Sequence, residues 1–173
     1  MSPRLKLLGI AAACAAPVVL ATLAYYFDWA PGGKGNYGEL IEPRTLNGTP
    51  FDDLRGKWVF VTFDPAACDD YCARKLYYMR QTRKAQAKEQ LRIERLWVVL
   101  DGAPPRAELT ELVHGVRLAP PDADWVNAFP GRREDHIYLV DPLGNLMMRF
   151  PRDPEPKLII KDLQRLLKYS RIG

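Results

Sequence analysis

Histidine and cysteine are the scarcest residues of this chain, with two histidines and three cysteines in 173 residues. So few cysteines exclude a small domain held together by many disulfides, and two histidines limit any metal or acid–base site built on imidazole. The sequence also lacks a glycine-rich phosphate loop and a serine–histidine–aspartate arrangement. Because the net charge is only +4, nucleic acid is not indicated as a partner.

Low-complexity tracts are absent as well, and the composition is otherwise ordinary for a folded protein. Hydrophobic residues make up 47% and charged residues 27% of the chain, which excludes a disordered or coiled-coil protein. The length allows one domain plus an appendage, but not an enzyme with separate cofactor and substrate domains.

Charge is missing from one stretch near the N-terminus, residues 7–27. As a helix this stretch would be about 30 Å long, which matches the hydrocarbon core of a lipid bilayer. Arg4 and Lys6 precede it, and aromatic residues stand at its far end, where an interfacial belt is expected. We therefore predict a membrane anchor over residues 1–27, with the N-terminus in the cytoplasm and the rest of the chain on the outer, periplasmic side of the inner membrane.

A cleaved signal peptide is the alternative interpretation of this stretch, but its apolar core is normally about 7 to 15 residues long and ends in small residues. The longer run here ends in large aromatics and favours a retained anchor, in which Cys14 is a small apolar residue of the membrane helix. Glycines and prolines follow, so we expect residues 28–46 to be a flexible tether and residues 47–173 to be the folded domain.

Segments typical of strands and helices alternate along this domain. Apolar, β-branched and aromatic runs predict buried strands, and apolar residues at helical spacing predict helices. The expected strands are residues 58–63, 96–100, 137–140 and 146–150, and the expected helices are residues 68–91, 106–113 and 156–169. This order gives a parallel pair of strands extended by an antiparallel hairpin and packed between helices, which is the three-layer α/β plan of thioredoxin-like folds.

Cys68 and Cys72 fall at the first strand-to-helix junction, where ligands of open α/β sheets bind. Four residues apart on a helix, their Cβ atoms would be about 5 to 6 Å apart. That distance requires local unwinding for a disulfide but suits two thiolates on one soft metal ion. Asp69 and Asp70 disfavour free thiolates, whereas the helix N-terminus favours them. A metal site, a redox pair and a structural disulfide all remain open at this point.

Four blocks of the domain resemble the Sco/SenC family in order and spacing, namely residues 56–63, 68–72, 98–101 and 137–144. That family consists of membrane-anchored thioredoxin-fold proteins that serve copper-site assembly in cytochrome c oxidase. The resemblance covers about residues 47–169. It implies that Cys68 and Cys72 match the copper-binding CxxxC pair of the family, and that Asp101 matches the acidic residue at the end of its next strand.

The chain departs from the family pattern around its ligands. Asp69 and Ala73 stand where the family has a proline after each cysteine, and Arg133 stands where it has a histidine ligand. His136 is near enough in sequence to replace that histidine and complete a site of two sulfurs and one nitrogen. The alternative for His136 is a strand-entry residue bonded to backbone, and His114 is interpreted as the last residue of a helix.

The resemblance implies a copper chaperone that holds Cu(I) through Cys68 and Cys72, with His136 as a third ligand, and delivers it to the copper-site subunit of cytochrome c oxidase. One alternative is a membrane-tethered thiol–disulfide oxidoreductase that uses the same cysteines to keep target cysteines reduced. Another is an assembly scaffold with neither chemistry. The basic residues after the pair are interpreted as a solvated helix face or as a docking surface for an acidic partner or anionic lipid. They are Arg74, Lys75, Arg80, Arg83, Lys84 and Lys88.

Overall fold

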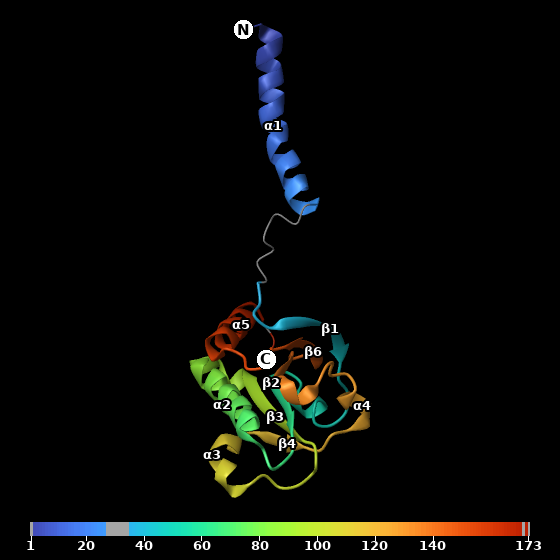
Figure 1. Cartoon of the computed structure of the whole chain (residues 1–173), viewed down its shortest axis with the longest axis vertical. Coiled ribbons are helices and arrows are strands. Elements are labelled where there is room, and N and C mark those ends of the chain that lie inside the picture. Colours follow the sequence, from blue (N-terminus) through green and yellow to red (C-terminus); the bar gives the residue numbers. More distant parts are fainter. Residues whose placement is uncertain (1, 27–34, 171, 173) are drawn as a thin grey trace. The chain divides into compact units, whose positions relative to one another are not determined.

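The computed structural model describes residues 2–26, 35–170 and 172, and the chain divides into two compact units, Met1–Gly35 and Asn36–Gly173. The first unit is built on helix α1 (Pro3–Tyr26), drawn in blue in Figure 1. Its segment Pro3–Ala24 reaches a mean hydropathy of 2.2 and is long enough to cross a bilayer. This helix agrees with the predicted membrane anchor. Residues 27–34, which include the start of the predicted tether, lie outside the described residues.

The second unit is built around a six-stranded mixed sheet with the strand order β1-β6-β5-β2-β3-β4. β2 lies inside this order, parallel to β3 and antiparallel to β5, and β5 and β6 form an antiparallel hairpin. The predicted parallel pair and the predicted hairpin are therefore confirmed. The strands are β1 (Glu39–Thr45), β2 (Trp58–Asp64), β3 (Ile93–Val99), β4 (Arg117–Ala119), β5 (Tyr138–Val140) and β6 (Asn145–Arg149).

Helices cover both faces of this sheet, which makes three layers (Figure 1). The helices are α2 (Asp70–Ala85), α3 (Thr110–Val113), α4 (Ala123–Val126) and α5 (Pro156–Tyr169), with 3-10 turns at Asp52–Leu54, Ala87–Arg92, Ala107–Leu109 and Arg133–Asp135. Alternate residues of β2 point to opposite faces. Phe60 packs in a cluster with residues of α2 and α5, whereas Phe63 packs with Trp125 of α4. The thioredoxin-like three-layer fold is thus confirmed.

Several element boundaries differ from the sequence-based expectation. The segment expected to be tether contains β1, an edge strand paired with β6, which the pattern conceals because almost all its side chains are exposed and it contains Pro43. The helix expected over residues 68–91 spans only Asp70–Ala85, because Asp69 caps its start and Ala87 takes a positive φ of 48°. The helix expected over residues 106–113 is a 3-10 turn followed by α3, and the short strand β4 was not expected.

Gly38 leaves no room for a side chain where the chain enters the folded unit. A Cβ atom at this position would lie 2.4 Å from Met148 Sδ and 3.0 Å from Phe150 Cε1. Gly38→Ala is therefore expected to lower the free energy of unfolding by about 1 to 3 kcal/mol through overpacking, measured by denaturant unfolding of the full chain in detergent. Gly9→Ala is the control, because nothing lies within 4 Å of a Cβ at Gly9. Equal stability of the two variants would contradict the prediction.

Candidate functional site

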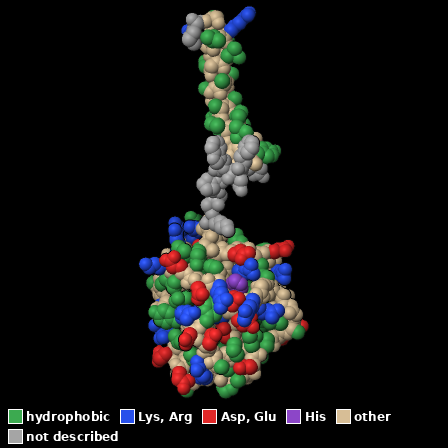
Figure 2. Space-filling model, in the orientation of Figure 1, with side chains coloured by type: hydrophobic (Ala, Val, Ile, Leu, Met, Phe, Trp, Pro, Cys, Tyr) green, Lys and Arg blue, Asp and Glu red, His purple; other side chains and the backbone are tan. Residues whose placement is uncertain are grey.

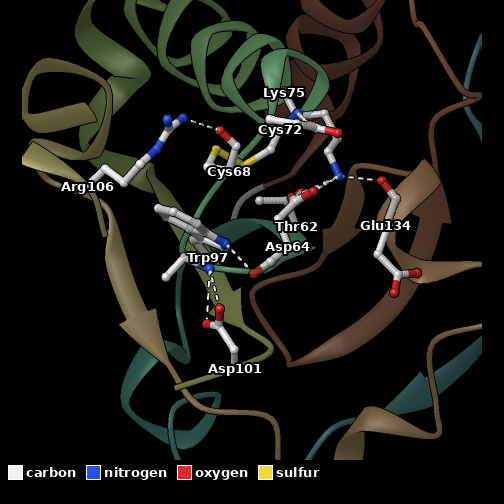
Figure 3. Close-up of a disulfide and its surroundings, with 11 residues drawn as sticks. Thr62, Asp64, Cys68, Cys72, Lys75, Trp97, Asp101, Arg106 and Glu134 are labelled. Carbon is white, nitrogen blue, oxygen red and sulfur yellow. Dashed lines mark hydrogen bonds and ion pairs between the residues drawn. A yellow bond between two sulfur atoms is a disulfide. The ribbon is translucent and has the colours of Figure 1, made fainter. Parts of the chain in front are cut away.

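Cys68 and Cys72 lie together at the junction of β2 and α2 (Figure 3), and they form a disulfide with Cα atoms 5.2 Å apart. Helix α2 begins only at Asp70, because the Asp69 carboxylate accepts the backbone N–H of Cys72 at 2.8 Å and caps the helix. Cys68 therefore lies outside the helix, with a φ of 41°. The local unwinding that the four-residue spacing requires for a disulfide is present.

Both cysteines are buried, with 0% and 1% of their surface exposed. Leu76 of α2, Trp97 of β3 and Leu109 pack against them. The guanidinium of Arg106 donates a hydrogen bond to the carbonyl oxygen of Cys68 at 2.6 Å (Figure 3). Because a partner cannot reach buried sulfur atoms, this part of the domain has to open before either cysteine reacts.

Asp101 lies just after β3 and holds the turn that leads to Cys68. Its carboxylate accepts the N–H of Ala66 at 3.0 and 3.2 Å and the N–H of Ala103 at 3.3 Å. The hydrogen bond from Ala66, helped by that from Ala103, lowers the pKa of Asp101 below its ordinary value. The acidic residue to which the family resemblance pointed thus positions the turn before the cysteine pair.

A buried ion pair lies between β2 and α2, one helical turn beyond Cys72. Lys75 Nζ is 2.9 Å from Asp64 Oδ1 and also donates to the carbonyl oxygen of Glu134, and Thr62 Oγ1 donates to Asp64 Oδ2 at 2.9 Å (Figure 3). The side chains of Lys75 and Asp64 are 0% and 6% exposed. Burial, although opposed by the attraction between the two groups, raises the pKa of Asp64 and lowers that of Lys75.

This pair was not predicted from the sequence, in which Lys75 was grouped with the basic residues of the helix face. The alternation along β2 was the available signal, because Phe60, Thr62 and Asp64 share one side of the strand and Phe60 packs against α2. A polar side chain on that side has to find its partner on the helix, because a buried charge is unfavourable without one.

His136 lies at the end of the 3-10 turn before β5. Its Nδ1 atom is 2.8 Å from the carbonyl oxygen of Phe150, and its ring lies edge-on to that of Tyr138 with centroids 5.8 Å apart. Among residues 2–26, 35–170 and 172, no three His, Cys, Asp or Glu side chains are grouped so that they could hold a metal ion. In this disulfide-bonded form the structure joins Cys68 to Cys72 but does not add His136 to them. His114 ends helix α3, as expected.

The other basic residues of α2 are largely occupied by contacts within the domain. Arg74 and Arg80 form ion pairs with Asp153 and Glu111, at 3.5 and 3.3 Å. Arg83 donates to a backbone carbonyl of β3 at 2.8 Å. These contacts favour the interpretation of a helix face with structural roles over that of a docking surface.

Removal of one partner of the buried ion pair should destabilise the fold strongly. Lys75→Met leaves the Asp64 carboxylate buried without its ammonium, so we expect the free energy of unfolding to fall by about 3 to 5 kcal/mol. The double variant Lys75→Met, Asp64→Asn should lose less than Lys75→Met alone, because no unpaired charge remains. Denaturant unfolding measures both. Lys84→Met, on the exposed side of the same helix, is the control, and an equal loss there would refute the assignment.

The hydrogen bonds to Asp101 should make part of the domain's stability depend on pH. A lowered pKa means that the folded state favours the carboxylate, so this stabilisation is present above the ordinary pKa of 3.8 and is lost as the pH falls through the lowered pKa. At about pH 7, Asp101→Asn should therefore lower the melting temperature. The difference in melting temperature between the variant and the wild type should become smaller in acid. Asp53→Asn, on an exposed carboxylate, is the control. A difference that is the same at every pH would contradict the prediction.

Solved structures that share this fold include two Sco1 proteins. Yeast Sco1, solved with copper bound, is 18% identical and has a TM-score of 0.55, over 80% of this chain and 96% of that chain. Sco1 from Thermus thermophilus, solved in the apo form, is 17% identical with a TM-score of 0.56, over 78% and 99%. A protein of Neisseria meningitidis assigned as a thioredoxin is 15% identical with a TM-score of 0.53, over 78% and 90%. At these identities the likeness establishes the fold, and it agrees with the Sco/SenC resemblance.

No curated protein matches the sequence. A protein family described as "Transmembrane-like, thioredoxin-like, C-terminal domain" matches residues 58–170. The match begins at the first residue of β2 and ends just after α5, so it includes the cysteine pair and five of the six strands. The chain therefore belongs to the family of transmembrane-like, thioredoxin-like C-terminal domains.

Proposed function

We propose that this chain is a membrane-anchored copper-binding assembly factor, which carries Cu(I) on Cys68 and Cys72 and delivers it to the copper-site subunit of cytochrome c oxidase. The observation that carries the proposal is the position of this CxxxC pair, at the junction of β2 and α2 in a fold shared with yeast Sco1, which was solved with copper bound. The recipient follows from the Sco/SenC resemblance and is part of the proposal.

The two sulfur atoms suit Cu(I) once the disulfide is reduced. Reduction takes two electrons and two protons and gives two thiols, and a bound Cu(I) ion then displaces both thiol protons. Thiolates are soft ligands that select Cu(I). Asp69 and Asp70 add negative charge beside the pair. This charge disfavours free thiolates but attracts a cation, which then stabilises them.

His136 is the proposed third ligand, and its hydrogen bond supports that role. A carbonyl oxygen only accepts, so the contact with Phe150 requires the proton of a neutral imidazole to sit on Nδ1. The lone pair is then on Nε2. Histidine ligands commonly fix their second nitrogen on a carbonyl in this way.

The anchor and its orientation belong to the same proposal. Arg4 and Lys6 precede the apolar helix α1, so the N-terminus would lie in the cytoplasm, residues 7–27 would cross the inner membrane, and the folded domain would lie on the periplasmic side. The anchor, tether and domain would follow one another as residues 1–27, 28–46 and 47–173, except that residues 36–46, which include β1, join the domain.

A thiol–disulfide oxidoreductase is the second candidate. It is favoured by the observation that the two sulfur atoms are bonded to each other, with no third ligand beside them in the described part of the chain. In that case one thiolate attacks a partner disulfide to form a mixed disulfide, and the second cysteine resolves it. The partner gains two electrons and this pair becomes the disulfide. A scaffold with neither chemistry is the third candidate.

Cu(I) loading separates these candidates. The full chain would be purified in detergent with Cys14→Ala, so that the free cysteine of α1 cannot bind metal, then reduced and loaded anaerobically in competition with a Cu(I) chelator. We expect about one copper ion per chain and loss of binding in Cys68→Ala and in Cys72→Ala. His136→Ala should weaken binding about 10-fold or more if it is a ligand, and unchanged affinity would remove it from the site.

The outcomes differ for each candidate. If the reduced chain retains no copper, the chaperone proposal is wrong. A reversible disulfide that exchanges electrons with a substrate thiol, measured in a glutathione redox buffer, would then support the oxidoreductase. If the chain neither binds copper nor exchanges electrons, the scaffold remains.

A further inference from the structure

Helix α5 presents an exposed face whose charged residues are all basic. Its four basic residues follow one another at intervals of four, four and three, which places them on one side of a helix. They are Lys157, Lys161, Arg165 and Lys168, and all four are exposed. The helix has one acidic residue, Asp162, which is buried. Figure 2 shows Lys and Arg side chains over the part of the domain where Figure 1 draws α5.

These four cations have no acidic partner among residues 35–170 and 172. None of them forms an ion pair there, and Lys168 lies over the ring of Tyr169 at 5.5 Å. Several basic residues of α2, in contrast, are paired. The face of α5 is thus a cluster of positive charges that no acidic side chain of the described residues neutralises. Such a cluster attracts an anionic surface.

Apolar side chains stand exposed next to the end of this basic face. Leu143, Tyr169 and Ile172 are 57%, 74% and 51% exposed. With Trp58, Met147 and Leu166 they line an apolar hollow of about 430 Å³. Basic residues that flank exposed aromatic and aliphatic side chains are typical of surfaces that lie on a membrane interface.

The chain that arrives from the anchor joins the domain on this same helix. The Asp162 carboxylate accepts the N–H groups of Tyr37 and Gly38, both at 2.8 Å, and Tyr37 Oη accepts the N–H of Glu155 at 2.9 Å. Ten peptide units separate Tyr26, the last residue of α1, from Asn36. A chain of ten peptide units is at most about 35 Å long, so the anchor enters the folded unit through a short connection that ends beside α5.

We propose that the basic face of α5, together with Leu143, Tyr169 and Ile172, docks on the anionic phospholipid headgroups of the membrane that anchors the chain. Lys and Arg side chains supply the attraction to the negative surface, and the exposed apolar side chains enter the boundary with the acyl chains. Neither part of this proposal depends on copper binding or on thiol chemistry.

Docking by this face would set the direction in which the cysteine pair points. Trp58, in the apolar hollow, is the first residue of β2, and the cysteine pair follows the last residue, Asp64. The strand is about 20 Å long, so the two features lie at opposite ends of the sheet. With the apolar hollow on the membrane, the end of the sheet that carries the cysteine pair is the end farther from the lipid.

Acylation of lysines measures this contact directly. The full chain would be reconstituted in nanodiscs of phosphatidylcholine, or of phosphatidylcholine mixed with phosphatidylglycerol, and treated with an amine-reactive reagent before mass spectrometry. We expect Lys157, Lys161 and Lys168 to react several-fold more slowly in the anionic discs, with recovery at high salt as the charges are screened. Equal rates in both kinds of disc would overturn the proposal.

Charge reversal provides the matched test. Lys161→Glu with Arg165→Glu should abolish the protection of Lys157 and Lys168. Arg44→Glu with Arg117→Glu changes the net charge equally at exposed residues of β1 and β4 and should leave the protection intact. An unchanged melting temperature shows that both variants are folded. If protection instead follows the number of chains per disc and not the lipid charge, the face binds a second copy of the chain and the proposal is wrong.

Discussion

The structure depends on one constraint, which is that β2 is buried along its whole length. Every residue from Trp58 to Asp64 is buried, with the sheet on both sides and helices above and below. The apolar residues of β2 are stabilised there by packing, but the buried Thr62 and Asp64 need hydrogen-bond partners for their polar atoms. They obtain them from each other and from Lys75. The end of the strand is therefore bound to α2 by charge as well as by apolar contact.

The geometry of the cysteine pair follows from that attachment. Lys75 fixes the second turn of α2, Asp69 caps the first turn, and Asp101 holds the turn that precedes Cys68. Each contact acts on backbone within a few residues of a sulfur atom. The pair is thus held by three carboxylates that lie around it, of which Asp64 and Asp69 flank the connection between β2 and α2.

Apolar periodicity was sufficient to predict most of the fold. The strands that bury both faces, β2 and β3, and the amphipathic helix α5 follow from hydrophobic patterns, because burial leaves a strong periodic signal. Strand β1 could not be predicted in the same way. It lies at the edge of the sheet, and its pairing with β6 rests on backbone hydrogen bonds, which leave little trace in side-chain pattern.

The site was predictable to the extent that its residues are close in sequence. Cys68 and Cys72 share a junction that a strand-then-helix pattern locates. The partners of the two carboxylates could not be named, because the fold brings them together. Ala66 reaches Asp101 from the neighbouring strand's end, and Lys75 reaches Asp64 from the facing helix. The contact of His136 could not be predicted for the same reason. Its position in the sequence before β5 does not determine which backbone carbonyl its ring nitrogen contacts.

The burial of a single pair of sulfur atoms has a consequence for how the protein can be controlled. The folded unit contains no cysteine besides Cys68 and Cys72. Their sulfur atoms can bond to each other or to a metal ion, but not to both at once. The disulfide and a metal ion therefore exclude each other, and the supply of reducing equivalents decides whether the two thiols are available at all.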